Sequence, residues 1–247
     1  RPFFISTAIP YVNAAPHIGH AQEFVIADAV ARYGRLIEKD VFFLSGSDDN
    51  ALKNVQAAEA AGKDVKAFVA ENASRFEDLQ KKLGISTDYF IRTSSDPLHA
   101  RGAQNLWSAC KPEDIEKRKY RGYYCVGCEE FKTEKELING ECPEHPGVKL
   151  EVVEEENYFF RLDHYQEKLL ALIENNDLEK SPESRRNETL AFIRGGREPF
   201  SISRSRERAR GWGVPVPGDD SQIMYVWFDA LANYITALGY ADDSEKF

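Results

Sequence analysis

Short apolar runs alternate with longer amphipathic segments over the first ninety or so residues. The compact runs, typical of buried strands, are Phe3–Thr7, Val41–Ser45 and Tyr89–Ile91. The apolar spacing of helices, three to four residues, covers residues 18–37, 51–61 and 65–83. Strands that alternate with helices predict an α/β fold with a doubly wound parallel sheet and right-handed crossovers.

The pattern changes near residue 113, where charge-rich loops and short apolar runs such as Tyr158–Phe160 begin. We therefore divide the chain into a first half of the α/β domain at residues 1–112, an inserted subdomain at 113–200 and a return to the sheet at 201–247. In the last part, Ser201–Arg204 is expected to lead back toward the parallel sheet. Ile223–Phe228 is predicted to form a buried strand, followed by a helix through Leu238.

Three of the four cysteines form a spaced pattern with a histidine. Cys125-Val-Gly-Cys128 is followed, after a loop, by Cys142-Pro-Glu-His145. Two such pairs are typical of a zinc knuckle, in which each tight turn supplies two ligands to a tetrahedron. The alternatives are that the thiols are incidental or that they form a redox Cys-x-x-Cys, although a redox pair needs no second pair at matching spacing. The pattern predicts a structural Zn²⁺ site within about residues 120–156.

His17-Ile18-Gly19-His20 stands where the loop after the first strand enters the first long helix. A helix N-terminus favours phosphate, because its N–H groups are unpaired and carry a partial positive charge. Gly19 leaves room for a base or a ribose. The two histidines can donate hydrogen bonds to phosphate oxygens and to the charge that develops during attack at phosphorus. The segment therefore predicts a nucleotide site at this junction.

Charge limits the class of partner. The chain has 32 basic and 41 acidic residues, a net charge of −9, whereas a simple nucleic-acid coat protein is usually basic. Residues 197–210 are a local exception, either a binding patch or a solvated loop, with five arginines: Arg197, Arg204, Arg206, Arg208 and Arg210. No apolar run approaches the roughly 20 residues of a membrane helix, so we expect a cytoplasmic protein with no membrane partner.

Four segments, taken in order, resemble the class I aminoacyl-tRNA synthetases, and the methionyl-tRNA synthetase family in particular. Thr7-Ala8-Ile9-Pro10-Tyr11-Val12-Asn13 leads into the His-Ile-Gly-His segment. Gly46-Ser47-Asp48-Asp49 is similar to the family's G-T-D-E-H-G segment, and the Cys/His pattern is similar to the knuckle of its connective-peptide insertion. The fourth segment is Tyr225-Val226-Trp227-Phe228-Asp229-Ala230 followed by Asn233-Tyr234. The resemblance covers the whole chain.

The resemblance implies a Rossmann-like domain of the HUP type. It would activate L-methionine with ATP and Mg²⁺ to methionyl-adenylate, release pyrophosphate and transfer methionine to the 3′ end of tRNA(Met). His17 and His20 would be catalytic, stabilising the transition state at the α-phosphate. ATP would be bound by Tyr11, His17, Gly19, His20 and Glu23. Methionine would be bound by Ala8, Ile9, Tyr11, Asp48, Trp227, Ala230, Leu231 and Tyr234. The metal ligands would be Cys125, Cys128, Cys142 and His145.

Several of these residues have a structural interpretation as well. Tyr225, Trp227 and Phe228 are also typical of core aromatics on a buried strand. Asp48 and Asp49 are also typical of caps of the helix that follows. If Asp48 does bind substrate, it accepts charge-assisted hydrogen bonds from the ammonium group of methionine.

The chain departs from the family pattern at two places. Asn50-Ala51 stands where the family has His-Gly, which leaves that local contact open, and Leu231 stands where some relatives have proline. Glu23 lies either near the ribose or at the surface. Arg204 either contacts phosphate or braces its loop.

The family's second ATP loop, of K-M-S-K-S type, and its anticodon-binding domain do not occur in this sequence. We expect an N-terminal catalytic part of a longer protein, weakly active or inactive because the positive charge of that loop is missing. One alternative is a class I synthetase for isoleucine, leucine, valine or cysteine, although residues 113–200 leave no room for a large editing insertion. The other is a non-catalytic, zinc-stabilised RNA-binding module.

Overall fold

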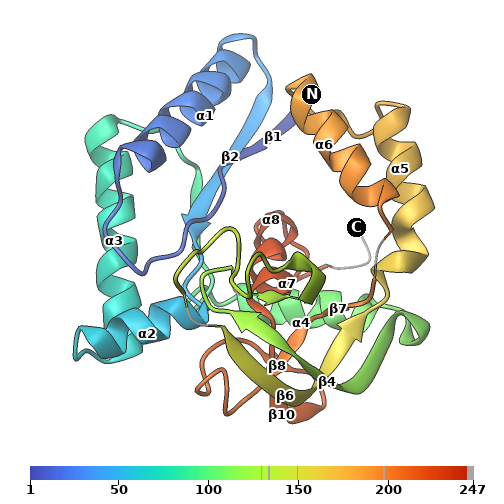
Figure 1. Ribbon diagram of the computed structural model, residues 1–247. Coiled ribbons are helices and arrows are strands. Elements are labelled where there is room, and N and C mark those ends of the chain that lie inside the picture. Colours follow the sequence, from blue (N-terminus) through green and yellow to red (C-terminus); the bar gives the residue numbers. More distant parts are fainter. Residues whose placement is uncertain (129, 133, 149, 197, 244–247) are drawn as a thin grey trace.

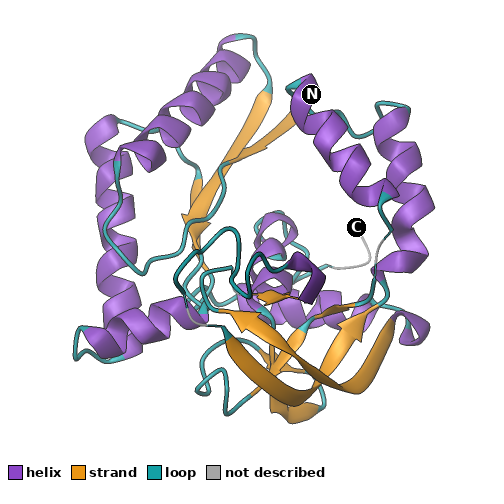
Figure 2. Cartoon of the chain, in the orientation of Figure 1, coloured by secondary structure: helices purple, strands orange, loops and turns teal. Residues whose placement is uncertain are grey.

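The computed structural model describes residues 1–128, 130–132, 134–148, 150–196 and 198–243 (Figures 1 and 2). The first part of the chain contains β1 (Pro2–Ser6), α1 (Ile18–Leu36), β2 (Asp40–Ser47), α2 (Leu52–Ala60), α3 (Val65–Leu83), β3 (Tyr89–Arg92) and α4 (His99–Ala109). The middle part contains β4 (Ile115–Cys125), β5 (Glu130–Lys132), β6 (Glu151–Phe160), α5 (Gln166–Glu174), α6 (Glu183–Arg194) and β7 (Phe200–Ser201). The last part contains β8 (Ser203–Ser205), β9 (Pro215–Val216), β10 (Asp219–Met224), α7 (Val226–Leu231) and α8 (Asn233–Thr236). Short 3-10 helices lie at Pro112–Asp114, Glu134–Glu136 and Leu162–Tyr165.

A parallel sheet in the order β1-β2-β3 organises the first part of the chain. Helices α1 and α3 lie on one of its faces (Figure 1), where Ala27 and Ala31 of α1 pack against Phe43 of β2. Small residues on α1 bring the helix close to the sheet, and the buried apolar area stabilises both. The three strands and three helices that the pattern predicted here are confirmed to within two residues at each end.

The other face of the parallel sheet is approached by α4 and α8. Phe42, Tyr89 and Ile91 point to this side and share a cavity with Thr236 of α8. Gly102 lets α4 and α8 approach closely, because a Cβ atom there would lie 2.1 Å from Thr236 Oγ1. Helices on both faces confirm the doubly wound α/β class. Among the described residues, no helix is both long and apolar enough to cross a bilayer.

Two antiparallel sheets lie in the middle and last parts of the chain. Strands β4 and β6 pair over ten residues, from Ile115 opposite Phe160 to Tyr124 opposite Glu151, and the full order is β5-β4-β6-β7. Basic side chains of β4 face acidic ones of β6, as in the pair Arg121 and Glu154, which favours this register. The smaller sheet has the order β8-β10-β9.

The predicted return of residues 201–247 to the parallel sheet is wrong for the strands of this segment. Strand β7 pairs with β6, and β8 pairs with β10 in the separate antiparallel sheet. The predicted strand Ile223–Phe228 ends at Met224, because the Tyr225 carbonyl accepts the N–H groups of Phe228 and Asp229 and so starts α7. An apolar run of this length fits a strand or a buried helix equally well. The expected helix through Leu238 is divided into α7 and α8.

Gly46 is required where β2 meets β3. A Cβ atom at this position would lie 2.3 Å from the backbone oxygen of Ile91 and 2.6 Å from its Cγ2. We expect Gly46→Ala to lower the free energy of unfolding by about 2–3 kcal/mol, since the backbone cannot move aside cheaply. Urea unfolding measures this. Gly34→Ala is the control, because its Cβ atom would meet only side chains, Val41 Cγ2 at 2.9 Å and Phe3 Cδ1 at 3.4 Å, and no backbone. Equal midpoints for both variants would contradict the close strand approach.

Candidate active site and metal centre

The carboxyl ends of β1 and β2 carry the predicted substrate residues side by side. The Asp48 backbone N–H donates to the Pro10 carbonyl at 2.9 Å, and Tyr11 and Asp48 form a parallel bridge. Asp48 is buried, with 3% of its surface exposed. This is the edge of a parallel sheet where ligands bind in open α/β folds. Ala8 and Ile9 lie on the same loop, Ala8 exposed and Ile9 half-buried.

The two histidines form a capping box at the N-terminus of α1. His17 is the N-cap, and its Nδ1 accepts the Gly19 N–H at 3.1 Å. The His17 N–H in turn donates to His20 Nδ1 at 3.1 Å, and the two rings lie 3.9 Å apart. Because both Nδ1 atoms accept, the neutral ring of each carries its proton on Nε2. Each histidine is thereby fixed in the tautomer that offers an Nε2–H donor.

His20 is the more enclosed of the pair. Burial and the neighbouring His17 lower its pKa, and its ring packs edge-on against Phe76. It is therefore neutral at neutral pH. The helix cap itself also favours glycine at position 19, because a Cβ atom there would lie 2.9 Å from Cε1 of His17. The cap itself excludes a side chain at this position, in addition to any contact with a nucleotide.

Glu23 has a partner in the structure. Its Oε1 accepts the Ala8 N–H at 2.6 Å, so it holds the loop after β1 against α1. Glu23 and Gly19 line a cavity of about 440 Å³ beside this loop. A ribose contact for Glu23 stays a prediction.

Helix α7 supplies the aromatic wall of the site. The Trp227 ring meets that of Tyr11 edge-on, with the centroids 6.3 Å apart, although the two residues are far apart in the sequence. Trp227 is 44% exposed, so the core interpretation is wrong for it, whereas Phe228 packs against Trp107 as a core aromatic. Beside Trp227, Ala230 is buried and Leu231 is exposed.

Tyr234 is half-buried and experiences the charge of two predicted substrate residues. Burial raises the pKa of its hydroxyl, and the negative charges of Glu23 and Asp48 raise it further. An electrostatic effect of both carboxylates on one phenol places them in one neighbourhood. The structure thus brings together residues from the loop after β1, the start of α1, the loop after β2 and the segment 227–234.

The capping interpretation of the two aspartates is wrong. Helix α2 begins at Leu52, and its N-cap is Ala51, with no side-chain cap. Asp49 instead accepts hydrogen bonds from the hydroxyl groups of Ser47 and Ser94, and burial raises its pKa. Asp49 is a buried structural carboxylate, and Asp48 is the one beside Tyr11.

The four predicted metal ligands meet at one point. The Sγ atoms of Cys125, Cys128 and Cys142 and the Nδ1 atom of His145 all lie within 4.8 Å of one another. Cys128 Sγ is 3.5 Å from Cys142 Sγ and 3.2 Å from His145 Nδ1. A tetrahedron with Zn–S bonds of about 2.3 Å has ligand separations of roughly 3.7 Å, so this donor set fits Zn²⁺. All four positions are filled by protein, which suits a structural ion.

The turn chemistry of the knuckle supports the same conclusion. A Cβ atom on Gly127 would lie 2.4 Å from the His145 ring, so only glycine lets the two turns meet. Burial opposes ionisation of Cys142, but hydrogen bonds with His145 and Cys128 outweigh it and lower the pKa to about 7. A lowered thiol pKa favours binding of a soft cation, because the thiolate is the form that ligates metals.

Lys53 connects the knuckle to the substrate loop, and no pattern in the sequence predicted it. Its Nζ donates to the Gly127 carbonyl at 3.2 Å and lies 4.0 Å from the centre of the Tyr11 ring. A lysine in the first turn of a helix is common at protein surfaces, so only the tertiary position of Lys53 reveals this link.

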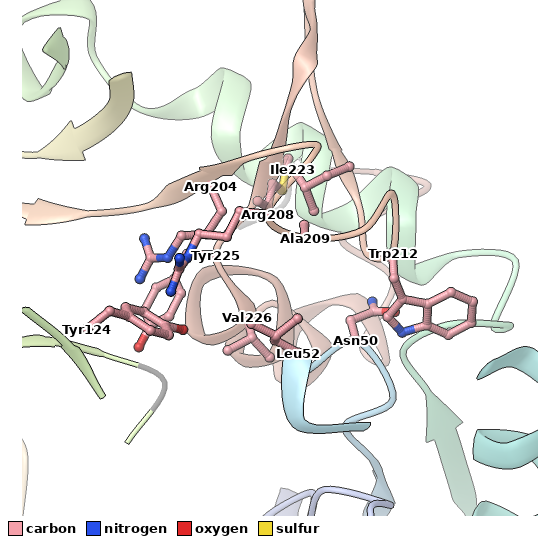
Figure 3. Close-up of a pocket in the computed structure, with 11 residues that line it drawn as sticks. Asn50, Leu52, Tyr124, Arg204, Arg208, Ala209, Trp212, Ile223, Tyr225 and Val226 are labelled. Atoms are coloured by element: carbon pink, nitrogen blue, oxygen red, sulfur yellow. The ribbon is translucent and has the colours of Figure 1, made fainter. Parts of the chain in front are cut away.

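The arginine-rich segment is mostly engaged within the protein. Arg204 is buried, donates to Ser201 and lies over the rings of Tyr225 and Phe131. Figure 3 shows its guanidinium group beside that of Arg208 near Tyr124. Arg208 and Arg210 form ion pairs with Glu151 and Glu59. Arg204 thus braces its loop, and Arg197 lies outside the described residues.

Comparison with known proteins agrees with this geometry. The family profile described as tRNA synthetases class I (M) matches residues 3–150 and 145–247. The chain belongs to the methionyl-tRNA synthetase family of class I. The methionine–tRNA ligase of Thermotoga maritima is 45% identical over 99% of this chain and 39% of its own length. The ligase of Mycobacterium tuberculosis is 43% identical over the whole chain and 48% of its own length.

Solved methionyl-tRNA synthetases show the same fold. The Mycobacterium tuberculosis synthetase bound by methionyl-adenylate matches with a TM-score of 0.91 at 42% identity, over 99% of this chain and 48% of the other. The free form of that synthetase matches with a TM-score of 0.79 at 39% identity, over 99% of this chain and 47% of the other. The family resemblance read from the four motifs is confirmed, and the chain spans about half the length of its relatives.

Proposed function

We propose that the protein containing this chain is a methionine–tRNA ligase, whose adenylate-forming site is built at the carboxyl ends of β1 and β2. The observation that carries the proposal is the meeting of Tyr11 and Trp227 beside the buried Asp48, next to two histidines fixed as Nε2–H donors. The related synthetase with bound methionyl-adenylate shares this fold.

Asp48 accepts hydrogen bonds from the substrate ammonium, and a buried carboxylate makes this a strong charge-assisted contact. The rings of Tyr11, Trp227 and Tyr234 pack on the thioether, because sulfur is polarisable and has little hydrogen-bonding capacity. Ala8, Ile9, Ala230 and Leu231 complete the pocket. Size discrimination of this kind amounts to about 1–3 kcal/mol per methylene.

In the activation step, a carboxylate oxygen of methionine attacks the α-phosphorus of ATP. The bond to the bridging oxygen of the β-phosphate breaks, and pyrophosphate leaves. His17 and His20 donate their Nε2–H groups to the oxygens on which negative charge grows. Tyr11, Gly19 and Glu23 line the ATP side, and Mg²⁺ accompanies the phosphates. Transfer of methionine to tRNA(Met) follows on the same site.

Zinc has a structural role in this proposal. Cys125, Cys128, Cys142 and His145 hold it, and it crosslinks the two turns of the knuckle. The chemistry of activation does not involve it. Lys53 transmits the position of the knuckle to Tyr11.

Calorimetric titration of L-methionine into this chain tests the proposal, with L-leucine, L-isoleucine and L-cysteine as parallel titrations. Saturable binding of methionine alone is the expected result. Saturable binding of another amino acid instead would keep the class I fold and change the substrate. Binding of none of the four would contradict the proposed site.

A further inference from the structure

One buried carboxylate joins three segments that are far apart in the sequence. The Asp229 side chain on α7 is 1% exposed. Its Oδ1 lies 2.5 Å from Nε2 of His99, in the first turn of α4. Its Oδ2 accepts a hydrogen bond from Nδ2 of Asn50, in the loop after β2, at 2.7 Å. Within the described part of the chain, no lysine or arginine forms an ion pair with this carboxylate.

The amide of Asn50 is oriented by its acceptors. Besides Asp229, its Nδ2 faces the Thr93 carbonyl at 3.4 Å, and both partners can only accept. The nitrogen is therefore the atom that faces them. The Asn50 backbone N–H also donates to Oδ1 of Asp48 at 3.3 Å. One residue thus touches both the proposed ammonium acceptor and the anchor of α7.

His99 secures the other oxygen of the same carboxylate. It is fully buried, and its Nδ1 has no hydrogen-bond partner among the described residues. Because a carboxylate only accepts, the proton between the two groups belongs to Nε2 of the ring. A fully buried imidazole with a single polar contact depends on that contact.

The network of Asn50, Asp229 and His99 lies next to proposed pocket residues in the sequence. Trp227, Ala230 and Leu231, the proposed wall against the methionine side chain, lie on the same short helix. Asp48, the proposed ammonium acceptor, lies two residues before Asn50. Asn50 also stands where the family resemblance led us to expect histidine.

We propose that Asn50 and His99, acting through Asp229, are positioning residues. They fix the separation between Asp48 and the wall formed by α7, and so set which side-chain length the pocket accepts. This inference rests on the proposed function and adds residues that do not touch substrate. An amide in place of imidazole keeps one N–H donor toward Asp229, so the departure from the family pattern preserves the contact.

The test compares Asn50→Ala, Asn50→Asp and Asn50→His by calorimetric titration of L-methionine and, separately, of ATP. Asn50→Ala is expected to weaken methionine binding about tenfold to a hundredfold, with little change in ATP binding. Asn50→Asp has the same size but places two carboxylates together, and is expected to weaken methionine binding at least as much. Asn50→His, which restores an N–H donor, is expected to recover most of the affinity.

Gln80→Ala is the matched structural control. Gln80 is also buried, and its amide donates to Ser45 Oγ at 2.8 Å and accepts from Thr87 Oγ1 at 2.9 Å, so its hydrogen bonds do not involve Asn50, His99 or Asp229. It is expected to lose stability but keep its methionine affinity. Unchanged affinity in Asn50→Ala and Asn50→Asp, or equal weakening in Gln80→Ala, would overturn the positioning role. Failure of the unmodified chain to bind methionine would instead overturn the proposed function.

Discussion

Replacing His20 with alanine is expected to slow methionine-dependent adenylate formation by about 10²–10³-fold and to leave methionine affinity nearly unchanged. The reason is that a fixed donor aimed at developing charge stabilises the transition state far more than the ground state. His20 is held as a neutral Nε2–H donor by the His17 N–H, and its lowered pKa keeps it in this form at neutral pH.

The measurement is exchange of labelled pyrophosphate into ATP by the full-length protein, with the methionine dissociation constant determined in parallel. His164→Ala is the control, since His164 pairs with Asp114 outside the proposed site. His20→Ala also removes one side chain from the α1 cap, which lowers the free energy of unfolding by about 1 kcal/mol, so the melting temperature is recorded as well. Loss of exchange that tracks only the melting temperature would argue against a catalytic role.

Removing the metal from the knuckle is expected to unfold it while the parallel sheet stays folded. Cys125→Ser leaves three ligands, and structural zinc sites in small peptides are worth about 10–16 kcal/mol of folding free energy. Between the end of β4 and the start of β6, the described residues contain only the short strand β5 and the 3-10 helix Glu134–Glu136 as regular structure, so the ion is the main crosslink of this segment. Zinc content by atomic absorption and backbone hydrogen exchange over residues 120–156 measure the two effects.

Cys110→Ser is the matched control, because Cys110 lies on the C-terminal side of α4 and donates to the Leu106 carbonyl. It is expected to keep one zinc ion per chain. Methionine affinity of the zinc-free protein is expected to fall several-fold, since Lys53 loses its acceptor on Gly127 and Tyr11 loses the charge that fixes its ring. Full metal content and unchanged exchange in Cys125→Ser would show that the ligand set is wrong.

Prediction from the sequence succeeded where local pattern and structure obey the same rule. The strand runs of β2 and β3 are bounded by polar segments, and the helical spacing of α1 and α3 persists over five turns, so the type of these elements was not ambiguous. It failed at Ile223–Phe228, where a short apolar run crosses from β10 into α7. The run is buried in either form, and only the hydrogen bonds of Tyr225 decide between them.

The site divides in the same way. The spacing of Cys125, Cys128, Cys142 and His145, and the placement of His17 and His20 at a helix start, were visible in the sequence because ligands on one turn and caps on one helix are near neighbours in the chain. The roles of Glu23 and Arg204 were not, because each depends on which partner the fold presents: the Ala8 N–H for the first, the aromatic rings near Ser201 for the second.

The sequence alone determined the fold class, the family, and the Cys/His set that the fold gathers at one point. The tertiary structure decided that the Trp227 ring faces Tyr11 and that Asp229 meets Asn50. Asn50 and Asp229 are 179 positions apart, and no local propensity relates them. They meet because the sheet, α4 and α7 pack around one carboxylate that cannot be buried without donors on both oxygens.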